Sequence, residues 1–181
     1  ITLTKRQGIP MCGIPHHALN NYLPKIVDSG VKVAIADQVE DPKLAKGIVR
    51  REVTRIITPG TVIDSSILSP SRSNYLVAIS AKKEHFGIAS IDISTGDFQI
   101  TEVDGYEELE NELSRLSAKE CVVSESLLKE WDAENRKPLA NTSVVWSCIE
   151  DWNFEYETAA DFLKNKFEVA SLDGFGCRGL D

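Results

Sequence analysis

Three consecutive strand-like segments in the second half of the chain place the strongest constraint on its fold. Residues 75–80, 87–94 and 97–103 are rich in β-branched and other apolar residues, and turn residues separate them. The connections are short, because Lys82-Lys83-Glu84 forms the first and Ser94-Thr95-Gly96 the second. Strands joined by turns this short pair antiparallel, so these residues predict a three-stranded meander.

Helix and strand patterns alternate after the meander. Leucines at helical spacing predict a helix over 106–116. The residues that follow predict a strand at 121–124, a short helix at 126–131, a strand at 143–148 and a helix at 158–169. The last helix is expected to direct four apolar side chains inward: Ala159, Phe162, Leu163 and Phe167. A meander followed by this alternation is typical of a ribonuclease-H-like α/β domain.

The first half predicts a smaller mixed α/β unit. Residues 1–6 alternate like the end of a strand, and the glycines and prolines of residues 7–15 predict a loop. A helix follows up to the stop at Ser29-Gly30, and Pro24 within it indicates either a start near Asn20 or Asn21 or a kink. Strands are predicted at 31–39 and 49–58, and the latter ends in the turn Thr58-Pro59-Gly60-Thr61.

Charge divides the chain at about the same place as the predicted folds. Residues 1–72 contain ten Lys or Arg against six Asp or Glu, a net charge of +4, whereas residues 73–181 carry a net charge of −12. Residues 63–73 are rich in serine and predict a linker. Two modules with different partners are therefore expected, and only the first has the charge that favours a phosphate backbone.

Several broad classes are excluded by composition. No apolar run approaches the roughly 20 residues that cross a bilayer, so we expect no membrane association. The four cysteines lie far apart without Cys-x-x-Cys spacing, which favours reduced, buried thiols over a zinc or disulfide framework. The N-terminus lacks the apolar core of a signal peptide, so the cytoplasm is the expected compartment. The chain begins at Ile1 without methionine, and we expect it to be a piece of a longer protein.

Three motifs in fixed order carry a resemblance to a known family. They are Ile-Pro-Met-Cys-Gly-Ile-Pro-His-His-Ala at residues 9–18, Val-Ala-Ile-Ala-Asp-Gln-Val-Glu-Asp-Pro at 33–42 and Arg-Glu-Val-Thr-Arg-Ile-Ile-Thr-Pro-Gly-Thr-Val at 51–62. In this arrangement the chain resembles the MutS family of DNA mismatch-repair proteins. Asp-Ile-Ser-Thr-Gly at 92–96 and Gly-Phe-Gly at 174–176 are similar to the connector domain of that family.

The resemblance implies a domain organisation and a role. Residues 1–62 would be the C-terminal part of a truncated mixed α/β mismatch-recognition domain, 63–73 a linker, and 74–181 a ribonuclease-H-like connector domain without its last helix. The intact protein would recognise mispaired double-stranded DNA as a homodimer, couple that state to ATP and Mg, and contact a MutL-type partner. The connector would contact other MutS domains and relay between DNA and the ATPase.

Two departures from the family limit what this piece is expected to do. The Phe-x-Glu motif that stacks on a mismatch should precede Ile1 and is absent. No glycine is followed by lysine, so the phosphate loop of the ATPase is absent as well. The fragment is therefore expected to be no enzyme and to hold no cofactor itself.

The candidate DNA contacts lie in the first half. Cationic side chains can meet phosphates without reading bases, and the alternative for each is an ordinary solvated strand edge. The resemblance further implies that the loop from Met11 to His17 lies near DNA. The predicted contact residues are Lys5, Arg6, Met11, His16, His17, Arg50, Arg51 and Arg55.

Three other functions compete with this hypothesis. Asp92, Asp97 and Glu102 are carboxylates of a ribonuclease-H-like fold, so a metal-dependent nuclease is the main alternative, although fold alone does not confer activity. A scaffold that binds only protein is a further alternative.

An aromatic platform for single strands is disfavoured by acidic neighbours, and core packing or a protein-binding face is expected of Trp131, Trp146, Trp152, Phe154 and Tyr156. His16-His17 lacks the spacing of a metal site, because adjacent helical residues point about 100° apart.

Overall fold

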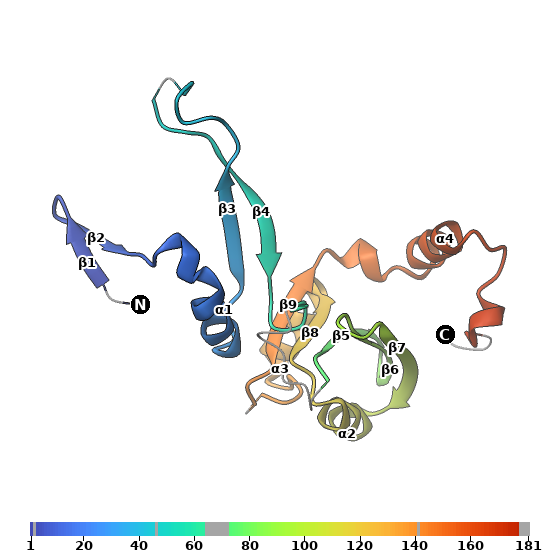
Figure 1. The fold of residues 1–181 in the computed structure, drawn as a ribbon. Coiled ribbons are helices and arrows are strands. Elements are labelled where there is room, and N and C mark those ends of the chain that lie inside the picture. Colours follow the sequence, from blue (N-terminus) through green and yellow to red (C-terminus); the bar gives the residue numbers. More distant parts are fainter. Residues whose placement is uncertain (2, 46, 64–72, 141, 178–181) are drawn as a thin grey trace.

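The computed structural model describes residues 1, 3–45, 47–63, 73–140 and 142–177 (Figure 1). The described elements of the first half form two separate hairpins, a short 3-10 helix and one α-helix. These are β1 (Leu3–Arg6), β2 (Ile9–Cys12), the 3-10 helix η1 (His16–Ala18), α1 (Leu19–Asp28), β3 (Val33–Gln38) and β4 (Arg51–Ile57). β1 pairs with β2 and β3 with β4, both antiparallel. Both hairpins project away from the rest of the molecule (Figure 1).

The segment predicted as a loop at residues 7–15 contains a strand, so that prediction is wrong for Ile9–Cys12. Gln7 and Gly8 both have positive φ, at 51° and 81°, and form a two-residue turn that returns the chain along β1. Pro10 lies in β2 opposite Lys5. Because β2 is an edge strand, a residue without an N–H is tolerated there.

Helix α1 supplies two of the four buried residues described for a small core in the first half. It begins at Leu19, one residue before the predicted start near Asn20, and Pro24 lies inside it. Pro24 lacks the N–H that would bond the carbonyl of Asn20, but Asn20 is exposed and water can serve that carbonyl. The predicted stop is confirmed, since Gly30 has a φ of +80° and its N–H bonds the carbonyl of Val27. Four buried residues form the core: Leu23, Val27, Ile57 and Val62.

The second half forms one mixed sheet of five strands. The predicted meander is confirmed as β5 (Tyr75–Lys82), β6 (His85–Asp92) and β7 (Asp97–Asp104), which pair antiparallel. β8 (Glu120–Ser124) and β9 (Val145–Ile149) add in parallel, and the strand order is β7-β6-β5-β8-β9. Five helical segments complete this half: α2 (Tyr106–Leu116), α3 (Glu125–Glu134), η2 (Asp151–Phe154), α4 (Tyr156–Phe167) and η3 (Asp173–Phe175).

A single core lies on one face of this sheet, against α2 and α3. Val77, Ile79, Phe86 and Ile88 alternate along β5 and β6, which places their side chains on the same face. Leu109 and Leu113 of α2 and Trp131 of α3 are fully buried against them. Trp131 also packs edge-on against Trp146 and donates from Nε1 to the hydroxyl of Tyr106 at 2.5 Å. Trp131 and Trp146 therefore belong to the core, as one of the alternatives predicted.

Helix α4 does not bury the face that its sequence predicted. Phe162 is 66% exposed, Phe167 52% and Leu163 38%, while Ala159 is half-buried and Ala160 is buried in its place. Figure 1 shows α4 set apart from α2 and α3. Amphipathic spacing defines an apolar face, but only a neighbouring element can cover it, and here η3 (Asp173–Phe175) contacts Phe167 through the ring of Phe175 without burying the face.

The prediction of buried thiols is also only partly correct. Cys121 is buried, but Cys12 and Cys148 are exposed and Cys177 is half-buried, and all four are free. Burial, with a smaller contribution from the charge of Glu120, raises the pKa of the Cys121 thiol to about 12. Of the predicted linker at 63–73, residues 64–72 lie outside the described part of the chain. No described helix has the length and apolarity that a membrane crossing demands.

Candidate nucleic-acid interface

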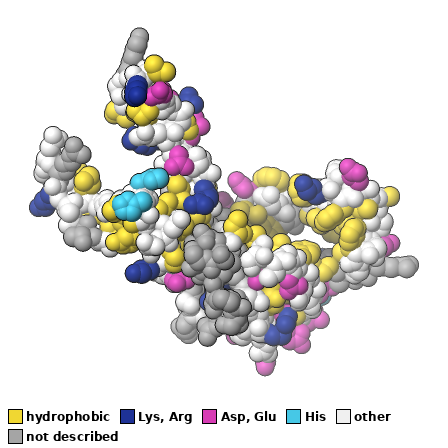
Figure 2. All heavy atoms as spheres, in the orientation of Figure 1, with side chains coloured by type: hydrophobic (Ala, Val, Ile, Leu, Met, Phe, Trp, Pro, Cys, Tyr) yellow, Lys and Arg dark blue, Asp and Glu magenta, His cyan; other side chains and the backbone are white. Residues whose placement is uncertain are grey.

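The predicted DNA contacts are distributed over the two projecting hairpins and the segment between them. Figure 2 shows Lys and Arg side chains on both hairpins, and histidine side chains over the segment that connects them. None of the predicted residues whose side chain is described is buried. The predicted interface is thus a set of solvent-facing side chains on two arms.

In the first hairpin, Lys5 and Met11 point to opposite faces. The register pairs Thr4 with Met11 and Lys5 with Pro10, and side chains alternate along each strand. Met11 is 44% exposed, and its carbonyl accepts from the hydroxyl of Thr4 at 2.8 Å. Arg6 pairs with Ile9 in the register, and its side chain lies outside the described part of the structure. This hairpin therefore does not gather its predicted contacts on one face.

His16 and His17 form the start of η1, between the hairpin and α1. Both are exposed. The chain enters this short helix directly after Pro15, whose carbonyl accepts from the N–H of Ala18 at 2.9 Å. The structure therefore presents both imidazoles to solvent, as a phosphate-contacting role requires.

In the second hairpin, a β-bulge separates two of the three predicted arginines. Ile35 pairs with Arg55 but Ala36 pairs with Val53, so Thr54 is the extra residue on β4. Side chains alternate on the unbulged strand β3, and through the register this places Arg55 on the face of Ile35 and Arg51 on the opposite face. The hydroxyl of Thr54 bonds Asp37 at 2.6 Å. The bulge thus gives β4 a cation on each face.

Neighbouring carboxylates reduce the positive charge of this hairpin unequally. Arg50 pairs with Glu52 at 2.8 Å, and its backbone N–H bonds a carboxylate oxygen of Glu40. Among the described acidic residues, none lies within ion-pairing distance of Lys5 or Arg55. The charges of Lys5 and Arg55 are therefore more available to a phosphate than that of Arg50, which Glu52 partly neutralises.

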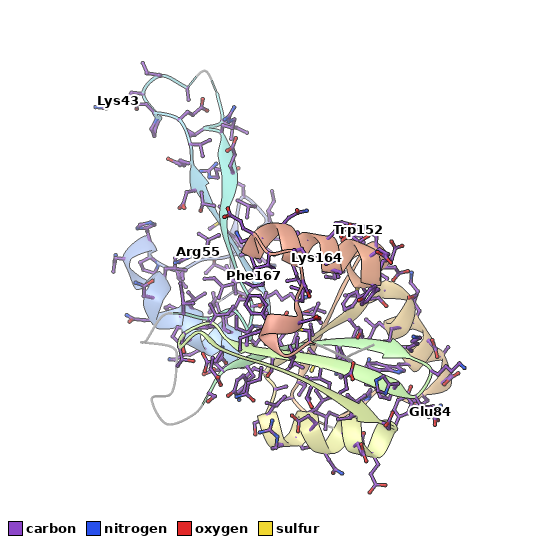
Figure 3. All side chains as sticks on the ribbon, turned by 90° about the vertical axis from the view of Figure 1, so that its right-hand side faces the viewer. Lys43, Arg55, Glu84, Trp152, Lys164 and Phe167 are labelled. Carbon is purple, nitrogen blue, oxygen red and sulfur yellow. The ribbon has the colours of Figure 1, made fainter. Side chains whose placement is uncertain are left out.

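The sequence prediction omitted a cation at the end of the second hairpin. Lys43 lies at the tip of the loop between β3 and β4 (Figure 3), where it is exposed. Its backbone N–H bonds the carboxylate of Asp41 at 2.8 Å. The turn residues Asp41-Pro42 before a lysine were the available signal, since they place that lysine at a loop tip.

The three carboxylates considered for the nuclease alternative do not gather on one face of the sheet. The register pairs Asp92 with Asp97 on one face of the sheet and Glu102 with Gly87 on the other. Glu120, also buried, pairs with Leu76 and so faces away from Asp92. Among the described residues no cluster of three or more His, Cys, Asp or Glu side chains could hold a metal ion. The nuclease alternative is not supported.

Asp92 instead has a structural role at the start of the sheet. One of its oxygens accepts from the backbone N–H of Asn74 at 2.9 Å, and the other from the N–H and hydroxyl of Ser94. Burial opposes ionisation of this carboxylate, but these hydrogen bonds outweigh it and lower the pKa of Asp92. The carboxylate of Asp92 therefore binds Ser94 in the turn before β7 and Asn74, the residue before β5.

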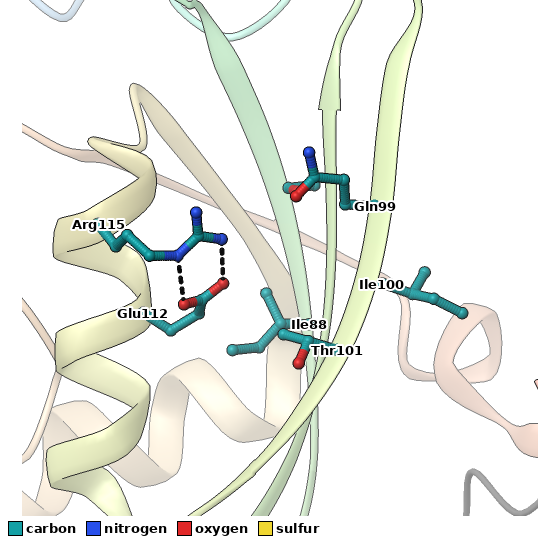
Figure 4. Close-up of a pocket in the computed structure, with 7 residues that line it drawn as sticks. Ile88, Gln99, Ile100, Thr101, Glu112 and Arg115 are labelled. Atoms are coloured by element: carbon teal, nitrogen blue, oxygen red, sulfur yellow. Dashed lines mark hydrogen bonds and ion pairs between the residues drawn. The ribbon is translucent and has the colours of Figure 1, made fainter. Parts of the chain in front are cut away.

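A polar hollow lies beside β7 and α2, on the core face of the sheet. It has a volume of about 370 Å³ and is lined by Ile88, Ser90, Gln99, Ile100, Thr101, Glu112 and Arg115. Figure 4 shows Arg115 joined to Glu112 by two bonds, which measure 2.7 and 2.6 Å. The hydrogen bond from Arg115 lowers the pKa of Glu112. The charges cancel within one helix, so the hollow offers no free cation for a phosphate.

Comparison with known proteins connects this geometry to a family. A family model described as MutS domain II matches residues 74–181, and one described as MutS domain I matches residues 1–66. The chain belongs to the MutS family. The two matches correspond to the halves that carry opposite net charge and separate cores.

Curated relatives agree with this assignment over nearly the whole chain. The chain is similar to the DNA mismatch repair protein MutS of Protochlamydia amoebophila, with 46% identity over 99% of this chain and 21% of that protein. Those of Lachnoclostridium phytofermentans and Methanococcoides burtonii are 43% and 38% identical over 98% and 99% of the chain. The chain spans about a fifth of the length of these relatives. The individual DNA contacts and the domain boundaries remain predictions.

Proposed function

We propose that this chain is a DNA-backbone-contacting and communication module of a DNA mismatch-repair protein. Residues 1–62 would be the C-terminal part of its mismatch-recognition domain, and residues 74–181 its connector. The observation that carries the proposal is the exposed cations on two projecting hairpins, in a half that family matching assigns to MutS domain I. The curated relatives are DNA mismatch repair proteins, and this supplies the biological process.

Contacts of this kind position a duplex without reading its sequence. Lys5, Arg51 and Arg55 are exposed on strands that project from the body. Cations in such positions release condensed counterions from phosphates, so binding weakens steeply with salt. The described part of domain I presents no aromatic wedge beside these cations, and we therefore expect no mismatch preference from this module.

For the second half we propose a ribonuclease-H-like connector that performs no chemistry. The order β7-β6-β5-β8-β9, with an antiparallel meander followed by parallel strands, supports this fold. In the intact protein it would link mispaired DNA to an ATPase that uses ATP and Mg, and it would contact other MutS domains and a MutL-type partner. A second copy of the chain would complete the DNA clamp.

Fluorescence anisotropy with a labelled duplex tests the proposal. We expect weak binding to paired and mispaired duplex alike, with an affinity that falls as salt rises. Arg55→Gln removes one phosphate contact and should reduce the slope of log affinity against log salt by about 1. Lys5→Gln should act similarly on the other hairpin.

Lys82→Gln provides the matched control, because Lys82 is an exposed cation at the end of β5 in the acidic half. It should leave both affinity and salt slope unchanged. An equal loss in Lys82→Gln and Arg55→Gln would contradict the proposed interface. Strong discrimination between paired and mispaired duplex would contradict it too, and no DNA affinity at low salt would favour a protein-binding scaffold.

A further inference from the structure

The turn Thr58-Pro59-Gly60-Thr61 lies where the two halves of the chain meet. Two hydrogen bonds close the turn. The N–H of Thr61 donates to the carbonyl of Thr58 at 3.0 Å, and the N–H of Thr58 donates to the hydroxyl of Thr61 at 2.9 Å. Pro59 and Gly60 are buried, although they belong to a turn. Turns usually lie in solvent, so burial here means that the second half covers this one.

Two side chains of the second half hold the turn. One carboxylate oxygen of Glu120 accepts from the N–H of Gly60 at 3.1 Å, and the other accepts from the hydroxyl of Ser147. Glu120 is only 3% exposed. The side-chain amide of Asn74 donates to the carbonyl of Pro59 at 2.9 Å, while its backbone N–H bonds Asp92. Both carboxylates buried in the sheet thus lead to this turn.

The backbone at Gly60 lies so close to the sheet that no side chain fits. A Cβ added there would lie 2.9 Å from both the Cβ of Glu120 and a methyl carbon of Leu76. Residues on either side of the turn, Ile57 and Val62, belong to the core that α1 completes. The C-terminal end of α1 also lies close to the sheet, because a Cβ added at Gly30 would lie 3.3 Å from the side chain of Val145 in β9. Packing therefore continues from the sheet, through the turn, to α1 and the second hairpin.

We propose that Glu120 and Asn74 form a latch on the Thr58–Thr61 turn, so that the β3–β4 hairpin and the five-stranded sheet move as one body. The latch does not depend on DNA binding. Its consequence is that a displacement of the hairpin reaches β8 and β9 through the buried hydrogen bonds of the turn. A buried carboxylate suits this role, because an N–H that loses its acceptor in a dry site has no water to replace it.

Nuclear magnetic resonance on the 181-residue chain, without DNA, tests the latch. Residual dipolar couplings from β3–β4 and from β5–β9 should fit one alignment tensor. Glu120→Ala should require two tensors and should accelerate hydrogen exchange at the amide of Gly60 by roughly tenfold or more. Glu120→Gln should retain one tensor, because its amide oxygen can accept from Gly60 while its NH₂ donates to the hydroxyl of Ser147.

Matched control variants distinguish loss of the latch from a general loss of stability. Glu130→Ala removes an exposed carboxylate of α3 and should change neither measurement. Gly60→Ala keeps every side chain of the sheet but forces the turn outward, and it should act like Glu120→Ala even if Glu120→Ala itself fails to fold. Gly13→Ala adds the same methyl group in open space and should have no effect.

Three results would overturn the proposal. The wild-type chain could require two tensors, or Gly60→Ala could retain one tensor with slow exchange at residue 60. Equal behaviour of Glu120→Gln and Glu120→Ala would refute the hydrogen bonds assigned to the carboxylate. None of these outcomes bears on the DNA contacts, so the two proposals fail independently.

Discussion

At the scale of single residues, position in the register decides what each charged side chain does. Asp92 and Glu102 lie on neighbouring strands, but they point to opposite faces of the sheet. Asp92 is fully engaged by Asn74 and Ser94. Asp92 therefore stabilises the turn before β7 and, through Asn74, the junction between the two halves.

Asp92→Asn tests this structural role. The new NH₂ group would face one of the N–H donors that the carboxylate now accepts from, so we expect a loss of roughly 1–3 kcal/mol in the free energy of unfolding at neutral pH. Because the pKa of Asp92 is lowered in the folded state, its stabilisation is present above the unfolded pKa and is lost as pH falls through the folded pKa. The difference between wild type and variant should narrow below about pH 4. Urea unfolding at several pH values measures it.

The exposed Asp161→Asn serves as the control for this experiment. Asp161 lies on α4 and pairs only loosely with Lys164, at 3.7 Å. Its replacement should change stability by less than about 0.5 kcal/mol. A gap between wild type and Asp92→Asn that stays constant into acid would show that the charge of Asp92 contributes nothing.

At the scale of elements, local patterns placed the helices and strands well but their ends and partners less well. Helix α3 begins at Glu125 rather than Ser126, because the hydroxyl of Ser124 accepts from the N–H of Leu127 at 3.2 Å. Asp151 adds a second cap on the N–H of Ser126 at 2.9 Å, and that hydrogen bond lowers the pKa of Asp151. A cap from 25 residues away has no local sequence signal.

Ser124→Ala should therefore destabilise the second half by about 1 kcal/mol, the usual cost of losing an N-cap. Thermal unfolding followed by circular dichroism measures this loss. Ser114→Ala, on the exposed face of α2, is the matched control and should be neutral or slightly stabilising, because alanine is the better helix former. Equal effects from the two substitutions would argue against the cap.

At the scale of the whole molecule, two separate cores are joined at one buried turn. Among the residues that the structure describes, the core of the first half contains four buried residues, whereas twelve form the core of the sheet. The hairpins of the first half expose large apolar side chains such as Leu3 at 70% and Ile56 at 66%. We therefore expect the first half to be the less stable of the two.

Leu23→Ala tests this difference. Leu23 is 2% exposed in the smaller core, and its truncation should cost about 2–5 kcal/mol there. All three tryptophans lie in the second half, so tryptophan fluorescence should report an unchanged unfolding midpoint for the sheet. Hydrogen exchange should become faster in β3 and β4. Leu113→Ala, in the larger core, should instead lower the fluorescence midpoint, and the same shift from Leu23→Ala would mean that the halves unfold as one.

The amino-acid sequence by itself determined the features that depend on short-range free energies. Apolar spacing, turn residues and the stop at Gly30 predicted the meander, α1 and α2, and the order of three motifs indicated the family. These signals suffice because backbone preferences and hydrogen bonds between near neighbours decide where such elements form.

The tertiary structure alone decided which residues meet. A bulge at Thr54 separates Arg51 from Arg55, α4 leaves Phe162 exposed, and Glu120 reaches across 60 residues to Gly60. Each outcome depends on the register or on a partner distant in sequence. A periodic pattern specifies a face without naming its neighbour, and a shift of one residue in the register moves every side chain to the other side.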